Sequence, residues 1–118
     1  MDFLQNLKEI GLEDDEANVY LSLLKLSKAT ATEISKKSKI ERTLTYKILE
    51  KLIERGLVTY IIENKKRYFY PSDPRKILEE LKEKVQNFKE MIPQLTSLSE
   101  PSKEEKVRVE IYKGKDGL

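Results

Sequence analysis

The spacing of apolar residues changes twice along the chain, and these two changes limit the folds that it can adopt. Before Gly56, apolar residues recur every three or four positions, which is the period of amphipathic helices. After it, the segments LVTYII and RYFYP are rich in β-branched and aromatic residues and flank the polar turn ENKK, a pattern typical of a β-hairpin. From Pro74 onward the helical spacing returns. We therefore expect several helices, one hairpin and a last helix, in that order.

Signals for helix starts and ends divide the first part of the chain. Thr30 and Glu33 fit a capping box, in which each side chain accepts a hydrogen bond from the other residue's free backbone N–H. Gly11 and Gly56 follow apolar runs, where helices often end. Helices are thus predicted over about residues 3–10, 14–26, 31–37 and 42–55, and another begins at Pro74.

The order of these elements is that of a winged helix-turn-helix, so we predict a mainly α fold with a small β-hairpin wing (α+β). The major groove of B-DNA admits one α-helix, and in this fold the helix before the wing enters it. The residues of that helix placed to contact DNA are Arg42, Thr43, Tyr46 and Lys47. A second set, suited to phosphates or to the narrow minor groove, lies at the hairpin tip and comprises Lys65, Lys66 and Arg67.

Charge is distributed unevenly, and the basic part coincides with these candidate DNA contacts. Residues 28–71 contain eleven Lys and Arg against five Glu, a net charge of +6, whereas residues 1–27 carry a net charge of −4. An anionic partner would therefore meet the middle of the chain. Each cation could instead belong to an ordinary solvated surface. Tyr46 could lie in the core, and Leu44 could be a plain surface residue or a contact for a thymine methyl group.

The helix predicted from Pro74 carries a narrow apolar stripe with the spacing of a coiled coil. Its residues, separated by 3, 4, 3, 4 and 3 positions, are Leu78, Leu81, Val85, Phe88, Ile92 and Leu95. This seam predicts a homodimer, although the helix could instead fold back on its own domain. Pro93 lies inside the pattern and is expected to kink or stop the helix near Ile92.

The residue types present argue against an enzyme and against a membrane protein. Without His or Cys, most arrangements of a nucleophile and a base are missing, and the acidic pair Asp14 and Asp15 is explained by its place at a helix start. We expect no cofactor and no metal. No apolar run approaches the length of a membrane span and the N-terminus has no secretory signal, so we expect a cytoplasmic protein. The alternative function is a winged helix that docks other proteins in a transcription complex, since the fold alone does not separate the two roles.

Three short patterns, in this order, resemble a known family. They are GLxxxEAxxYLxLL, ATxxEI and RxxxYxILxxLxxRGLV. Over about residues 4–71 the chain is similar to the N-terminal domain of the TrmB-like transcriptional regulators, which are mostly archaeal, and the segment from Pro71 onward is similar to that family's linker helix. The resemblance implies a sequence-specific regulator that binds double-stranded DNA as a dimer on a pseudo-palindromic operator.

The last residues, VRVEIYKGKDGL, resemble the first strand and turn of that family's effector-binding domain. The rest of such a domain is absent from the sequence, so the chain is either a fragment or a natural short form, and small-molecule sensing by it is not expected. The predicted division is a DNA-binding domain over 1–71, a coiled-coil dimerisation helix over 72–98, and a linker with the start of a truncated or absent effector domain over 99–118.

Overall fold

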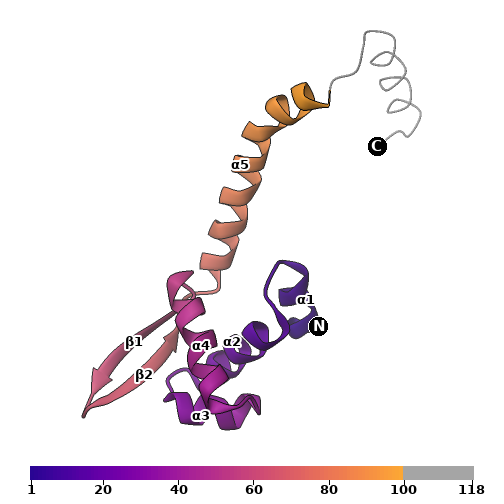
Figure 1. Cartoon of the computed structure of the whole chain (residues 1–118). Coiled ribbons are helices and arrows are strands. Elements are labelled where there is room, and N and C mark those ends of the chain that lie inside the picture. The colour runs from indigo at the N-terminus through magenta and orange to yellow at the C-terminus, as the bar shows by residue number, and fades with distance from the viewer. Residues whose placement is uncertain (100–118) are drawn as a thin grey trace. The chain divides into compact units, whose positions relative to one another are not determined.

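The computed structural model describes residues 1–99, which contain five helices and one β-hairpin (Figure 1). In chain order they are α1 (Phe3–Glu9), α2 (Asp14–Leu26), α3 (Ala31–Ser38), α4 (Arg42–Glu54), β1 (Val58–Glu63), β2 (Lys66–Pro71) and α5 (Arg75–Leu98). This order confirms the predicted winged helix-turn-helix, with α3 and α4 as the helix pair and the hairpin as the wing. The strand expected around residues 107–111 lies outside the described residues.

Local hydrogen bonds fix the starts of α2 and α3. The predicted capping box of α3 is present: the backbone N–H of Thr30 donates to the Glu33 carboxylate at 2.8 Å, and the N–H of Glu33 donates to the Thr30 hydroxyl at 3.3 Å. The backbone bond from Thr30, followed by the bond from its hydroxyl, lowers the pKa of the Glu33 carboxyl. At α2, Glu13 and Glu16 form a second capping box, which was not predicted.

One apolar core holds α2, α3, α4 and the wing together. Fully buried side chains from each element meet in it, among them Leu23, Ile34, Leu49 and Phe69. Phe69 of β2 is also joined through its backbone to Ala29, just before α3, by N–H···O bonds of 2.7 and 3.1 Å in the two directions. The wing is therefore anchored to the helices by side-chain burial and by backbone hydrogen bonds.

The wing ends in the predicted turn ENKK, whose two central residues connect the strands. Glu63 pairs with Lys66 across the hairpin, so only Asn64 and Lys65 connect the strands. Both have positive φ angles, 49° and 64°, as the central residues of a type I′ turn do. Asparagine adopts this conformation more readily than lysine does. The turn places Lys65 at the tip of the wing.

α5 begins in the packed part of the molecule and continues as a helix past Pro93 to Leu98. Of the two predicted effects of Pro93, the stop near Ile92 is therefore wrong, and the kink stays a prediction. Pro93 cannot donate a hydrogen bond to the carbonyl of Lys89, but this part of the helix is exposed, so water can bond that carbonyl instead. By its contacts the chain divides after Leu81, within α5, and Met1–Leu81 is one compact unit.

Candidate nucleic-acid interface

α4 presents one buried face and one exposed face. Its buried residues are Thr45, Ile48, Leu49 and Leu52. The Thr45 hydroxyl donates to the backbone carbonyls of Ile40 and Glu41 at 3.2 and 3.0 Å, which ties the first turn of α4 to the residues before it. On the other face lie the predicted DNA contacts, of which Arg42, Thr43 and Lys47 are exposed and Tyr46 is half-buried. The helix is thus held from one side and accessible from the other.

Three residues at the start of α4 add detail to this face. Glu41, whose charge would oppose a phosphate, accepts the backbone N–H of Thr43 at 3.0 Å and so caps the helix. Leu44 is 38% exposed and lies on the surface. The ring of Tyr46 packs partly against the core, and its centroid is 5.8 Å from the guanidinium of Arg42. Tyr46 therefore contributes both to the core and to the surface beside Arg42.

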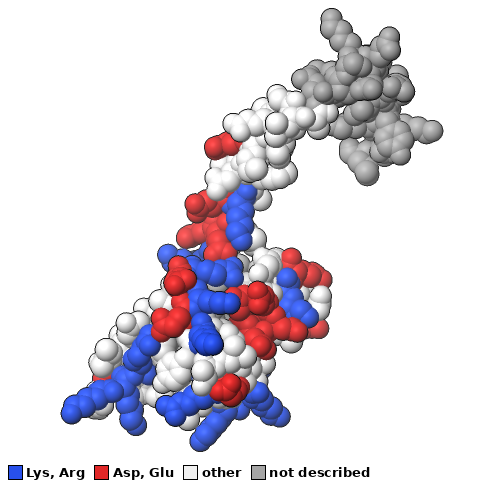
Figure 2. All heavy atoms as spheres, in the orientation of Figure 1, with Lys and Arg blue, Asp and Glu red and all other residues white. Residues whose placement is uncertain are grey.

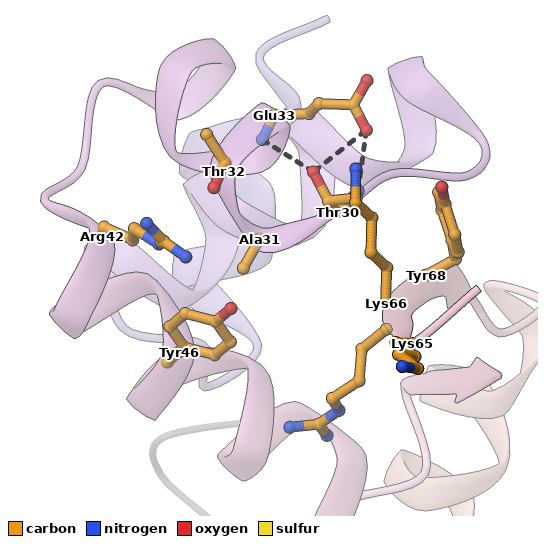
Figure 3. Close-up of a pocket in the computed structure, with 10 residues that line it drawn as sticks. Thr30, Ala31, Thr32, Glu33, Arg42, Tyr46, Lys65, Lys66 and Tyr68 are labelled. Atoms are coloured by element: carbon orange, nitrogen blue, oxygen red, sulfur yellow. Dashed lines mark hydrogen bonds between the residues drawn. The ribbon is translucent and has the colours of Figure 1, made fainter. Parts of the chain in front are cut away.

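An open cavity of about 690 Å³ lies between the start of α3, the start of α4 and the tip of the wing. Figure 3 shows Arg42 and Tyr46 on one side of this opening and Lys65, Lys66 and Tyr68 on the other. The first residues of α3 close a third side. Residues of the predicted recognition helix and of the predicted wing are thereby brought together, although they lie far apart in the sequence. Thr43 and Lys47 are exposed outside this cavity.

Most cations around this cavity are unpaired. Figure 2 shows Lys and Arg side chains gathered at the lower end of the molecule, over the wing tip, α3 and α4. Among residues 1–99, no ion pair links Arg42, Lys47, Lys65 or Lys66 to a carboxylate. Unpaired cations on a concave surface attract a polyanion more strongly than cations that neighbouring carboxylates already neutralise. This end of the molecule therefore offers positive charge from two separate elements.

Arg67 differs from the two lysines beside it. Its guanidinium forms an ion pair with Glu50 of α4 at 2.9 Å. It also lies over the rings of Tyr60 and Phe69, at 4.0 and 4.9 Å from their centroids. The sequence predicts three equivalent cations at the wing tip, but the structure separates them. Lys65 and Lys66 are exposed and form no ion pair among the described residues, although the charge of Lys66 acts on Glu33 at the cavity's edge, whereas Arg67 is paired with Glu50 of α4.

Lys28, in the connection between α2 and α3, is a further cation of the wing region that was not predicted. Its ammonium group pairs with Glu63 at 3.1 Å and lies 4.8 Å from the ring centroid of Tyr68. The hydrogen bond to Glu63 raises the pKa of Lys28. The sequence signal that could have indicated this contact is the alternation along β2, which places Tyr68 and Tyr70 on one face of the hairpin. Each face of the wing therefore carries one cation over aromatic rings.

The predicted dimer seam of α5 is exposed for most of its length. Its exposed members, at 40 to 56% exposure, are Leu78, Val85, Phe88, Ile92 and Leu95. Leu81 is the exception, because it packs half-buried against the core beside the buried Ile77. In the described residues of a single chain, this apolar stripe has no cover.

Two other kinds of feature are absent from residues 1–99. No three His, Cys, Asp or Glu side chains of this part of the chain are grouped so that they could hold a metal ion. None of its helices combines the length and the apolar character needed to cross a bilayer.

Comparison of sequences groups the chain with transcriptional regulators. Residues 7–75 match the family model described as sugar-specific transcriptional regulator TrmB. The HTH-type sugar sensing transcriptional regulator TrmBL1 of Pyrococcus furiosus is 37% identical over 82 residues, which make up 70% of this chain and 24% of that protein. The chain thus spans about a quarter of the length of this curated relative.

Solved structures of similar proteins share the fold. The structure of TrmBL2, described as an archaeal chromatin protein with a novel mode of DNA binding, aligns with a TM-score of 0.60 at 24% identity and covers 81% of this chain and 40% of that one. A possible transcriptional regulator from Methanosarcina mazei aligns with a TM-score of 0.67 at 17% identity over 78% of this chain and 82% of that one. A regulator of the MarR family from Silicibacter pomeroyi aligns with a TM-score of 0.54 at 23% identity over 95% and 78% of the two chains. At these identities the similarity shows the winged-helix fold.

Proposed function

Since this chain belongs to the TrmB family of transcriptional regulators, we propose that its winged helix binds double-stranded DNA and that two copies regulate transcription from a pseudo-palindromic operator. The family consists of regulators and not enzymes, in agreement with the expectation from the residue types present. The observation that carries the proposal is the cavity across which Arg42 of α4 faces Lys65 and Lys66 of the wing. Cations from two elements around one concave surface suit a DNA groove, with those of α4 facing the base edges and those of the wing facing the phosphates beside them.

In this proposal α4 is the recognition helix and lies in the major groove. Arg42 and Lys47 are exposed and unpaired in the described part of the chain, so both can donate to the O6 and N7 acceptors of guanine. Thr43 can donate to or accept from either type of base pair. Tyr46, half-buried at the edge of the cavity, is placed for a contact with the DNA backbone.

The proposed dimer uses the exposed seam of α5. We assign residues 1–71 to DNA binding and residues 72–98 to dimerisation, because the apolar stripe of α5 has no cover within the described chain. A two-fold axis through such a pair would place the two α4 helices over half-sites about one helical turn apart, roughly 10 base pairs, or a multiple of it. In the cytoplasm this dimer would have direct access to chromosomal DNA.

Selection of bound duplexes from a random pool tests the proposal and gives the site, its symmetry and its spacing together. With the selected duplex, Arg42→Ala and Lys47→Ala should each leave the circular dichroism spectrum unchanged. At least one of them should weaken binding about tenfold or more, because a good bidentate base contact contributes about 1–3 kcal/mol of discrimination. Lys25→Ala on α2 removes the same charge outside the proposed interface and should have little effect. Binding by both α4 variants at the affinity of the parent would rule out α4 as the recognition helix.

The wing is tested by its effect on salt dependence. Replacing Lys65 and Lys66 by alanine should weaken binding to all duplexes similarly, because contacts to phosphates do not depend on sequence. The slope of log affinity against log salt should become shallower by about 0.9 for each phosphate that the variant no longer neutralises. An unchanged slope would remove the wing from the interface. A parent protein whose binding hardly depends on salt would instead favour the alternative, a winged helix that docks other proteins.

A further inference from the structure

The side chain of Arg67 is held by α4 and by the wing at once. Its Nη2 atom lies 2.9 Å from the Glu50 carboxylate, and its guanidinium lies over the rings of Tyr60 and Phe69. Its Nε atom is buried and has no hydrogen-bond partner among the described residues. The side chain is 32% exposed. A guanidinium that lies over two rings and is paired at one end has little freedom to reach another partner.

The register of the hairpin explains why Arg67 meets α4. Side chains alternate between the two faces of a strand, so Arg67 and Phe69 lie on the same face of β2. Tyr60 is paired with Phe69 across the hairpin and therefore belongs to this face as well. Because Phe69 is fully buried in the core, this is the face of the wing that turns toward the helices. Arg67 thus lies between the wing and α4.

Glu50 occupies the face of α4 that is proposed to meet DNA. It follows Lys47 by three residues and Thr43 by seven, and residues at these spacings share one side of a helix. An unpaired carboxylate there would repel phosphates. Among residues 1–99, Arg67 is the cation that lies within ion-pair distance of Glu50.

We propose that Arg67 is a positioning residue, which sets the wing against the recognition helix and neutralises Glu50, and that it does not itself bind DNA. This inference rests on the proposed function. It has a consequence that charge alone does not predict. Loss of the Glu50 carboxylate removes a negative charge from the DNA-facing side, yet it should weaken binding to the operator, because the wing loses its fixed position.

The test compares Glu50→Ala with Glu54→Ala, a control that removes the same charge one turn later on α4. Glu54 is exposed and forms no ion pair among residues 1–99. Glu50→Ala should weaken binding to the duplex selected from the random pool by about tenfold, the effect of one charge-assisted hydrogen bond in a partly exposed pair. Because the wing is proposed to contact phosphates, binding of this variant to a scrambled duplex should weaken by a similar factor. Glu54→Ala should not weaken binding to either duplex.

A second comparison separates positioning from direct contact. Arg67→Met should weaken binding to the selected duplex more than Glu50→Ala does, because it breaks the same pair and also leaves the Glu50 carboxylate without its cation. The double variant should bind like Glu50→Ala. The salt slope of Arg67→Met should equal that of the parent, because Lys65 and Lys66 still reach their phosphates and only the ordering of the wing costs affinity, whereas Lys66→Met should reduce the slope by about 0.9. Without DNA, amide hydrogen exchange in β1 and β2 should be faster in Glu50→Ala and in Arg67→Met than in the parent.

Three outcomes would overturn the inference. The first is an affinity of Glu50→Ala for the selected duplex that equals or exceeds that of the parent. The ion pair between Arg67 and Glu50 would then contribute nothing to DNA binding. The second is a reduced salt slope in Arg67→Met like that of Lys66→Met, which would make Arg67 a direct phosphate contact. The third is unchanged exchange of the wing amides, which would exclude the positioning role. Failure of the parent to bind any duplex would refute the proposed function instead, and the exchange measurement would still test the contact between the wing and α4.

Discussion

Two helices of this protein carry apolar stripes at helical spacing, and only one of the stripes is covered. In α4 the stripe residues Ile48, Leu49 and Leu52 are at most 4% exposed. In α5 the stripe residues Val85, Phe88 and Ile92 are 46 to 56% exposed. Helical spacing therefore tells which face of a helix will be apolar, but not which surface will cover that face.

The difference arises from the neighbours of each helix. α4 packs against α2, α3 and β1, and its buried residues belong to the single core of Met1–Leu81. α5 contributes Ile77 and part of Leu81 to that core, but no described residue covers its later turns. The second stripe is more regular than a small winged-helix core requires, which is why we propose that a second copy of the chain covers it.

The largest expected loss of stability comes from the buried face of α4, and the exposed face of the same helix provides the comparison. Leu49→Ala should lower the free energy of unfolding by about 2–5 kcal/mol, because the deletion leaves a cavity in a packed core. Leu44→Ala makes the same chemical change on the exposed face of the same helix and should cost about 0.5 kcal/mol or less. Urea unfolding followed by circular dichroism measures both. Equal losses from the two variants would mean that both faces of α4 are packed, and would contradict the burial of Leu49 and the exposure of Leu44.

A charge placed in the apolar stripe of α5 tests whether a second copy of the chain covers that stripe. If a second copy covers the seam, Phe88→Asp would bring two carboxylates together in an apolar interface. The dimer should then weaken by about 3 kcal/mol or more, a change of at least about a hundredfold in its dissociation constant. Sedimentation velocity should show the parent as a dimer and this variant as a monomer at micromolar concentration. The helical signal of the winged-helix unit should remain.

The matched control for this experiment is Asn87→Asp, which adds the same charge at the neighbouring position of α5. Asn87 is exposed and lies outside the seam, so the variant should sediment like the parent. A parent that is monomeric at micromolar concentration would refute the dimer and leave the stripe of α5 uncovered. A dimer that survives Phe88→Asp would place the interface elsewhere on the chain.

Much of the fold could be predicted because local signals and burial agree in this chain. The capping box of Thr30 and Glu33, the change of period after Gly56 and the apolar face of α4 each led to an element that the structure contains. The exposure of Arg42 and Lys47 followed in the same way, since residues opposite a buried stripe face outward. For these positions the sequence neighbours within one or two turns decide the outcome.

The parts that could not be predicted depend on contacts between distant elements or on an unusual local conformation. Arg67 pairs with Glu50 only because the hairpin folds back over α4. The sequence alone could therefore not distinguish Arg67 from the neighbouring Lys65 and Lys66. The tight turn puts Lys65 at a positive φ angle that lysine rarely adopts. Pro93 stays inside α5 although proline usually ends a helix.

A smaller loss of stability is expected from breaking the hydrogen bond between Thr30 and Glu33, which lies outside both apolar stripes. Thr30→Ala removes the hydroxyl that accepts the backbone N–H of Glu33, and it should lower the free energy of unfolding by about 1 kcal/mol. Thr30→Ser keeps this hydroxyl and should stay close to the parent. The same urea titration that measures Leu49→Ala measures this loss. A cost as large as that of the core variant would mean that Thr30 supports more than the start of α3.

The last and smallest effect concerns the pH dependence of stability at the same cap. The pKa of Glu33 is lowered in the folded protein, chiefly because its carboxylate accepts the backbone N–H of Thr30, so the folded state favours the charged form. A group with a lowered folded pKa contributes stability that is fully present above its unfolded pKa and is lost as the pH falls through the folded pKa. For a glutamate this loss begins below about pH 5 and continues past pH 4.

Glu33→Gln should therefore have a lower free energy of unfolding than the parent at pH 7. The difference should be only a fraction of the stability that the cap contributes, since the side chain is solvated, and it should become smaller at about pH 3.5. Urea midpoints at the two pH values measure this, with Glu54→Gln, an exposed carboxylate outside the cap, as the control that should show no such narrowing. A gap that stays constant with pH would mean that the Glu33 charge has no part in holding the start of α3.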